Sequence, residues 1–335
     1  MKVAVTGGTG YLGAHTTRAL LADGHDIRLL VHPDESVSAL LPLFGSAADR
    51  IEVLRGDIRA ADVVTGLLAG CDAVLHAAGV VGTDNRRETL MWEVNTAATA
   101  TLLTRATLLG LDPIVHVASY SALFPPPGPV IGPDSPTAPG RSAYGRTKAA
   151  ADRIARALQD AGAPVAITYP SSVVGPGLGG MRGVTAGGWA PMIAAGVAPR
   201  LRGGMQMIDV RDVADVHAAV MRPGRGPRRY MCGGELIEFD EIVDILERAS
   251  GHRLRRIPLT PSVFRGIGRV ADALGRVLPV SAGLSYEAAW LLTSATPTDD
   301  SRTLSELGLT WRSARAALSA SVRASAPGST EPVAP

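Results

Sequence analysis

The sequence predicts an α/β fold, in which a doubly wound parallel sheet carries helices on both faces and a smaller C-terminal domain follows. Short apolar runs alternate with helical stretches up to about residue 170, and this alternation is typical of parallel sheets. A glycine-rich turn also follows the first apolar run directly. Finally, 46% hydrophobic and 19% charged residues in a chain of 335 suit a globular protein with a full core.

The glycine-rich turn is the most informative stretch of the chain. It follows a strand over residues 3–5, opens a helix over residues 11–23, and reads Thr6-Gly7-Gly8-Thr9-Gly10-Tyr11-Leu12-Gly13. This spacing of glycines is the one that binds dinucleotides, because it lets the backbone approach a pyrophosphate and lets the helix pack closely on the strand. Free N–H groups at the start of the helix would hold the phosphates. We therefore predict cofactor contacts at Gly7, Gly10, Tyr11, Leu12 and Gly13.

Further strands and helices continue the alternation. Five apolar runs predict strands over residues 27–31, 51–54, 73–76, 114–117 and 165–169. Two long helices are expected over residues 87–109 and 142–160. Between them, residues 124–140 are rich in proline and predict an irregular loop.

The end of the second strand is where the adenosine ribose should bind. A carboxylate at that point would accept the ribose hydroxyls and select NAD. Here His32 follows the strand, and the acid, Asp34, comes only after Pro33. Because His32 and Arg28 could approach a 2′-phosphate instead, the sequence slightly favours NADP over NAD. The alternative interpretation is that His32 is an ordinary loop histidine.

Cofactor contacts are also expected after the third and fourth strands. Asp57 and Ile58 follow the third strand, where Asp57 could accept a bond from the adenine amino group. The alternative for Asp57 is a helix N-cap. After the fourth strand, the chain could pass close to the ribose and phosphates because its side chains are small at Ala77, Ala78 and Gly79.

Three residues are candidates for catalysis. Tyr144 and Lys148 are four residues apart at the start of one predicted helix, so they share a face, and Ser119 ends the fifth strand. A phenol has a pKa of about 10, and a nearby ammonium group and an oxidised nicotinamide both favour the phenolate. Tyr144 would then act as acid and base in hydride transfer while Ser119 holds the substrate oxygen. The alternatives are that Tyr144 and Lys148 form an ordinary amphipathic pair, and that Ser121 replaces Ser119.

After about residue 170, strands and helices no longer alternate regularly. Residues 175–188 predict a glycine-rich loop, and a short strand from residue 207 leads into a helix from about residue 212. An amphipathic helix is expected over residues 239–250. A further apolar stripe over residues 263–278 predicts a helix that covers the pocket, with a helix at a membrane surface as the alternative.

Composition excludes several classes of function. A net charge of +2 argues against nucleic acid as a partner. Cys71 and Cys232 are far apart, which predicts neither a metal site nor a redox pair. No signal segment or bilayer-spanning run is apparent, so we expect a cytoplasmic protein.

These motifs together resemble the extended short-chain dehydrogenase/reductase family, also called the NAD-dependent epimerase/dehydratase family. The matching pieces follow the family's order to about residue 220, and they are residues 6–13, Gly56-Asp57, His76-Ala77-Ala78, Asn95, Ser119, Tyr144 to Lys148, Pro170 with residues 175–177, and residues 210–214. The resemblance implies a Rossmann-like domain, a Ser119–Tyr144–Lys148 triad and a homodimer formed through helices 87–109 and 142–160. It also implies that Lys148 binds the cofactor, together with Asn95, Pro170, Ser172 and Val173.

The resemblance further implies a division of the chain. Residues 1–170 form the NAD(P)-binding domain, and a segment at about 205–220 returns to it. Residues 171–323 form most of the substrate-binding domain, and residues 324–335 are expected to be a disordered tail.

Departures from the family pattern indicate a branch. Sugar-nucleotide dehydratases carry Thr-Asp-Glu after the fifth strand, whereas this chain has Ser119-Tyr120-Ser121. Epimerases usually place an asparagine where Ser171 and Ser172 stand. Pocket loops offer apolar residues, namely Met181, Val184, Trp189, Met192 and Ile193. The chain therefore looks most like the dihydroflavonol 4-reductase and 3β-hydroxysteroid dehydrogenase branches, which interconvert ketones and alcohols on ring-containing small molecules. The alternatives are a sugar-nucleotide epimerase and a non-enzymatic NADP sensor.

Overall fold

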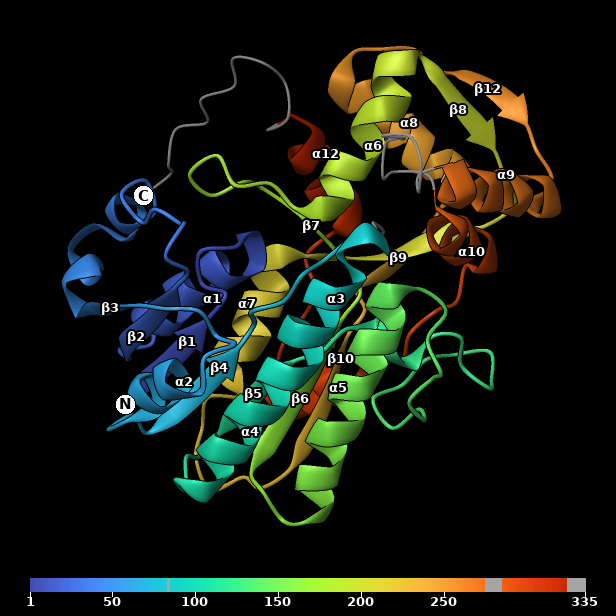
Figure 1. Ribbon diagram of the computed structural model, residues 1–335. Coiled ribbons are helices and arrows are strands. Elements are labelled where there is room, and N and C mark those ends of the chain that lie inside the picture. The colour runs from blue at the N-terminus through green and yellow to red at the C-terminus, as the bar shows by residue number, and fades with distance from the viewer. Residues whose placement is uncertain (83–84, 275–284, 324–335) are drawn as a thin grey trace.

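A parallel sheet of seven strands forms the centre of the protein in a computed structural model that describes residues 1–82, 85–274 and 285–323 (Figure 1). All of its strand pairs are parallel. Across the sheet the strands are β3 (Ile51–Arg55), β2 (Asp26–Val31), β1 (Lys2–Thr6), β4 (Ala73–His76), β5 (Ile114–Val117), β6 (Val165–Pro170) and β10 (Arg228–Cys232). The strands predicted from the sequence are confirmed, and β10 is an additional one that begins with two arginines at the edge of the sheet.

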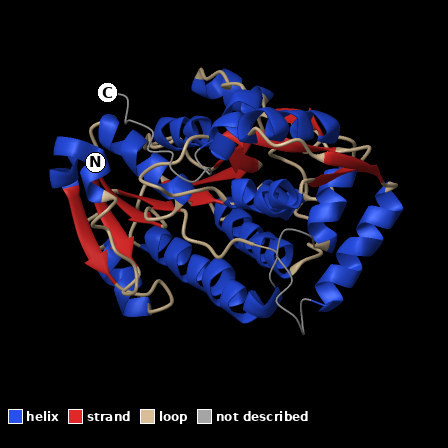
Figure 2. Cartoon of the chain, turned by 90° about the horizontal axis from the view of Figure 1, so that it is seen from above, coloured by secondary structure: helices blue, strands red, loops and turns tan. Residues whose placement is uncertain are grey.

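Helices cover both faces of this sheet, as Figure 2 shows from above. The central strands β4 and β5 are buried along their whole length, as expected of a parallel sheet between two helical layers. One core cluster joins one face to helices α1 (Tyr11–Ala22) and α7 (Val210–Ala219). A second cluster joins the other face to α2 (Ala61–Leu68), α4 (Thr99–Leu108) and α5 (Ala143–Asp160). The predicted doubly wound α/β fold is therefore confirmed.

The helix expected over residues 87–109 is interrupted by a wider turn. A 3₁₀ turn (Asn85–Arg87) and α3 (Glu88–Met91) lead into a π-helical segment (Trp92–Ala98) before α4 begins. Such π segments are rare and are often found at functional sites. Further 3₁₀ helices, which the sequence analysis did not predict, cover Leu41–Arg50 and Tyr120–Leu123.

The C-terminal elements lie above the carboxyl ends of the central strands (Figure 1). Their strands are β7 (Ser172–Val174), β9 (Gly204–Asp209) and β11 (Glu235–Glu238) in one sheet, and β8 (Val197–Arg200) paired with β12 (Arg255–Pro258). Their helices are α6 (Val184–Ala195), α8 (Phe239–Ser250), α9 (Pro261–Leu274), α10 (Tyr286–Ser294) and α12 (Ala314–Arg323). Helix α11 (Ser301–Leu307) packs instead against β10 of the central sheet and against α7. A third core cluster joins α6, α8 and α12.

Two expectations for this half need adjustment. The predicted loop 175–188 is wrong over its last residues, because α6 already begins at Val184. The apolar residues of α6 pack into the third core despite Gly187 and Gly188, so tertiary packing overrides their low helix propensity. The predicted helix 263–278 begins at Pro261, and its last residues, 275–278, lie outside the described residues, as does the expected tail 324–335. Within the described ranges, none of the helices is both long and apolar enough to span a bilayer.

Candidate active site

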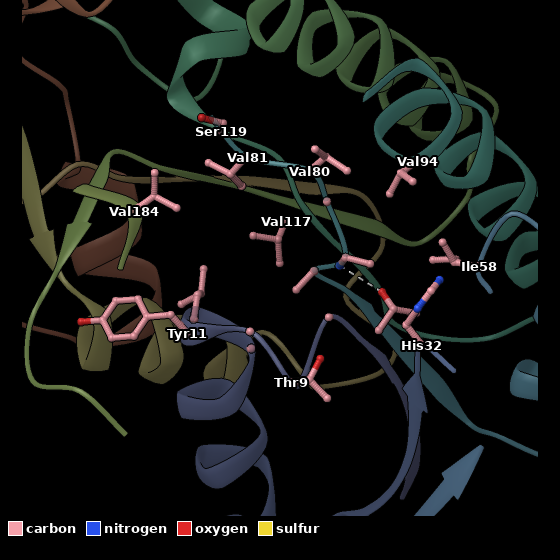
Figure 3. Close-up of a pocket in the computed structure, with 18 of the residues that line it drawn as sticks. Thr9, Tyr11, His32, Ile58, Val80, Val81, Val94, Val117, Ser119 and Val184 are labelled. Carbon is pink, nitrogen blue, oxygen red and sulfur yellow. Dashed lines mark hydrogen bonds between the residues drawn. The ribbon is translucent and has the colours of Figure 1, made fainter. Parts of the chain in front are cut away.

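A cavity of about 650 Å³ lies at the carboxyl ends of the central strands (Figure 3). This is where ligands of open parallel sheets bind. Most residues that the sequence analysis assigned to the cofactor line it, namely Gly7, Gly10, Tyr11, Leu12, Gly13, His32, Asp57, Ile58, Ala77, Ala78, Gly79, Lys148, Pro170 and Val173. The candidate catalytic residues Ser119 and Tyr144 line the same cavity.

The glycine turn has the shape that a pyrophosphate requires. Gly7 has a φ of +72°, and a Cβ there would lie 2.5 Å from the backbone nitrogen of Ala78. A Cβ at Gly13 would lie 2.0 Å from the carbonyl oxygen of Gly7. Helix α1 has no side-chain N-cap, so the N–H groups of its first turn are available to a ligand. These residues fit a nicotinamide dinucleotide.

Charged side chains surround the adenosine end of the cavity. The His32 ring lies 3.8 Å from the carboxylate of Asp57, which in turn binds Arg59. Glu35, another lining residue, accepts a hydrogen bond of 2.5 Å from the hydroxyl of Thr9. The sequence analysis missed Glu35 because it stands four residues beyond β2 in an irregular segment that carries no pattern.

Two predicted cofactor contacts lie off the cavity. Asn95, in the π-helical segment, is 2% exposed. Its amide bonds both the N–H and the carbonyl of Val80, at 2.7 and 3.0 Å, and so positions the strip of backbone that lines the cavity. Ser172 does not line the cavity either, whereas its neighbours Ser171 and Val173 do, since side chains alternate along an extended segment.

The candidate catalytic residues come together from two elements. Ser119 follows β5, and Tyr144 and Lys148 lie in the first turns of α5. The hydroxyl of Ser121 donates to that of Ser119 at 2.9 Å, and Tyr144 interacts with both serines. Lys148 is 7% exposed and donates to the carbonyl of Val117 at 3.0 Å.

Burial sets the protonation of these groups. It raises the pKa of Tyr144 to about 12, although the interactions with Ser119 and Ser121 lower it. Burial also lowers the pKa of Lys148 to about 8. The phenol therefore carries its proton at neutral pH in this state, and any depression of its pKa must come from charge that a ligand brings.

The remaining wall of the cavity is apolar with two arginines. Val80, Val81, Leu90 and Val184 line it, and three of these valines are labelled in Figure 3. Arg87 and Arg182 line it too, and neither has a hydrogen bond or ion pair with another described residue. Of the apolar residues predicted for the pocket, only Val184 lines this cavity, and Trp189 packs instead against Phe239.

Comparison with known proteins identifies the family to which the chain is similar. The model of the NAD dependent epimerase/dehydratase family matches residues 3–233. "Sterol demethylase protein B" of Methylococcus capsulatus is 32% identical over 96% of this chain and 97% of its own length. A "Putative dihydroflavonol 4-reductase" of Synechocystis is 26% identical over 95% and 92%.

Solved structures share the fold. UDP-glucose 4-epimerase of Bifidobacterium longum, in complex with NAD⁺ and UDP, superposes with a TM-score of 0.73 at 19% identity, covering 97% of each chain. The family model, which matches residues 3–233, and the relative that is 32% identical over nearly the whole chain establish that the chain belongs to the NAD-dependent epimerase/dehydratase family.

Proposed function

We propose that the protein is a nicotinamide-dependent oxidoreductase that interconverts a ketone and an alcohol on an apolar, ring-containing small molecule. The observation that carries this proposal is the shared cavity of the glycine turn, Ser119, Tyr144 and Lys148. The names of two relatives that align over nearly the whole chain, a sterol demethylase protein and a putative dihydroflavonol 4-reductase, support a ring-containing substrate.

Each side chain of the site has a chemical role in this proposal. The nicotinamide, when bound, supplies or accepts the hydride. Tyr144 gives its proton to the substrate oxygen during reduction and takes it back during oxidation. Ser119 donates a hydrogen bond to the same oxygen and fixes its position. Lys148, one turn away from Tyr144, would hold the cofactor ribose.

The charge of the substrate follows from the rim of the cavity. Arg59, Arg87 and Arg182 line it, and among the described residues Arg59 is the one of these three that forms ion pairs, with Asp57 and Glu93. Arg87 and Arg182, which have no ion-pair partner within the described ranges, would bind an acidic group such as a carboxylate, with charge-assisted hydrogen bonds. We therefore expect an apolar body that carries a negative substituent.

Glu35 favours NAD over NADP as the cofactor. The carboxylates of Glu35 and Asp57 both line the adenosine end of the cavity. They would accept ribose hydroxyls and repel a 2′-phosphate. His32 and Arg59, which could attract the phosphate, already face Asp57. This reverses the slight preference for NADP that the displaced Asp34 suggests.

A homodimer through α3, α4 and α5 remains part of the proposal. Trp92, in the π-helical segment between α3 and α4, is 39% exposed, and Leu108 of α4 is 80% exposed. Ile154 of α5 is also partly exposed. Placing an arginine at Ile154 should convert a dimer to a monomer in size-exclusion chromatography with light scattering, whereas a wild-type monomer would contradict the dimer.

A sugar-nucleotide epimerase is the second candidate, since Arg87 and Arg182 in the wall of the cavity would also bind a diphosphate. The experiment that separates the two follows reduced-nicotinamide absorbance while the protein meets a panel of ketosteroids and flavonoid ketones, each with and without a carboxylate. Net consumption of NADH supports the reductase. Tight calorimetric binding of UDP-glucose, without net consumption, supports the epimerase.

A further inference from the structure

Glu287 is a buried carboxyl group that the proposed reaction leaves unused. It stands in the first turn of α10, which lies beside the start of α5 (Figure 1). Its Oε1 is 3.5 Å from the point where a Cβ would stand on Gly145. Its Oε2 is buried without a hydrogen-bond partner in the part of the chain that the structure describes. Such an oxygen is costly to bury, and a native structure rarely keeps one without a use.

A small cavity lies between Glu287 and Ser121, the neighbour of the candidate catalytic Ser119. It has a volume of about 10 Å³, which is close to the space that one water molecule needs. Ser121 and Glu287 both line it, together with Phe124, Arg141, Gly145 and Trp290. A water there would have the Ser121 hydroxyl on one side and the unpartnered Glu287 carboxyl oxygen on the other.

The other side of Ser121 faces the catalytic tyrosine. The Ser121 hydroxyl donates to Ser119 at 2.9 Å, and Tyr144 interacts with both hydroxyls. We infer that Glu287 is the terminal proton carrier of a relay that runs from Tyr144 through Ser121 and one water in this cavity. The inference rests on the proposed function, because the relay serves the proton that Tyr144 exchanges with the substrate.

The relay moves one proton and no electrons. During reduction, Tyr144 gives its proton to the substrate oxygen and regains one from Ser121. Ser121 takes a proton from the water, and the water takes one from the carboxylic acid of Glu287. During oxidation every O–H bond forms and breaks in the opposite direction, and Glu287 ends protonated. The hydride itself travels only between substrate and nicotinamide.

The surroundings of Glu287 suit a group that changes its charge near neutral pH. Burial raises the pKa of Glu287 to about 7, the Ser142 N–H and Arg146 lower it, and Asp272 of α9 raises it. The charged and titratable groups near it on other elements are Tyr120, Arg141, Tyr144, Arg146, Arg265 and Asp272. Arg141 and Arg265 are stacked on Trp290, at 3.9 and 4.1 Å from its ring centroid, and Arg269 is stacked on Tyr286.

The test compares Glu287→Gln with the wild type across pH, in the ketone-reduction assay. Glutamine keeps the shape and one acceptor oxygen but cannot pass on an acidic proton. We expect kcat for reduction in the wild type to fall as pH rises through about 7, because Glu287 loses the proton that it must supply. In Glu287→Gln, kcat should be about 10- to 100-fold lower, within the range of acid–base contributions. The inflection of kcat near pH 7 should disappear in this variant. Its KM and its affinity for NADH should stay unchanged.

Three further variants separate a relay from a structural role. Asp272→Asn removes a neighbouring charge that raises the pKa of Glu287, so it should keep kcat and move the inflection to lower pH. Ser121→Ala should lose the pH inflection of kcat, whereas Ser121→Thr, which keeps a hydroxyl group, should retain it. If Glu287→Gln fails to fold, this pair of variants tests the relay instead.

The outcomes distinguish the relay from the reaction that it serves. A kcat within twofold of the wild type and an unchanged inflection in Glu287→Gln or Ser121→Ala would overturn the relay alone. A folded wild-type protein that turns over no ketone and no alcohol would overturn the proposed function, and the relay with it.

Discussion

The two ends of the large cavity are built in different ways. The cofactor end consists of backbone at strand ends, where a Cβ on Gly13 would lie 2.0 Å from the carbonyl oxygen of Gly7. The substrate end consists of side chains from the segment before α3, including Arg87, and from the start of α6 and the loop before it, including Arg182. We therefore expect that even an added methyl group disturbs the cofactor end, whereas single side chains at the substrate end can be replaced without disturbing the fold.

The largest expected effect therefore comes from crowding the cofactor end. Gly13→Ala places a methyl group against the Gly7 carbonyl, and such overpacking costs about 1–3 kcal/mol, occasionally more. We expect a lower unfolding midpoint and a cofactor affinity that falls by at least about tenfold, measured by thermal denaturation and calorimetry.

Gly66→Ala is the matched control for this change. Gly66 lies in α2 with nothing within 4 Å of its added Cβ, so alanine should stabilise the helix by about 0.5–1 kcal/mol. If Gly13→Ala and Gly66→Ala changed the unfolding midpoint and the cofactor affinity equally, this would contradict the claim that close packing of the glycine turn restricts substitution at the cofactor end.

An intermediate effect is expected at the substrate end. Replacing Arg87 or Arg182 with methionine removes a charge but keeps an extended side chain. Hydrogen bonds to charged groups contribute about 1.5–3 kcal/mol, so KM for a carboxylated ketone should rise about 10- to 100-fold. The uncharged analogue of that ketone serves as the control, and its KM should stay nearly constant. An equal rise for both ketones would contradict an anionic substrate.

The smallest effect is expected from the charge of Glu35. Glu35→Gln keeps an acceptor for Thr9 but removes the negative charge that would repel a 2′-phosphate. The ratio of NADPH to NADH affinity should rise by less than about tenfold, since the site is exposed and screened. A wild-type protein that already binds NADPH more tightly would contradict the selection of NAD.

The cofactor end of the cavity could be predicted from the sequence more completely than the substrate end. Strand ends and the glycine turn are local patterns, so the sheet and most residues of the cofactor end could be predicted. Ser172 was predicted at the cofactor, whereas Ser171 lines the cavity. Which of the two serines faces the cavity depends on how this segment pairs with β9, a contact between distant parts of the chain. Asn95 was expected at the cofactor, but a π-helical turn directs its amide to Val80.

The substrate end depends on contacts between distant segments. Glu287 lies close to Gly145, more than a hundred residues away in the sequence. Arg182 lies in the loop just before α6, a helix whose apolar residues pack into the third core. Neither position has a local signal. Lys148 was expected to lower the pKa of Tyr144, but burial raises that pKa to about 12. The Lys148 ammonium group donates to the Val117 carbonyl.

The most direct test of the central claim is the turnover of Tyr144→Phe with a ketone that the wild type reduces. Phenylalanine keeps the ring and removes the hydroxyl group that carries the proton, so calorimetry should show unchanged affinity for NADH. We predict that kcat falls by about 10²- to 10⁴-fold, the range of acid–base catalysis. Turnover close to that of the wild type would show that Tyr144 is not the proton donor and would contradict the account of this site.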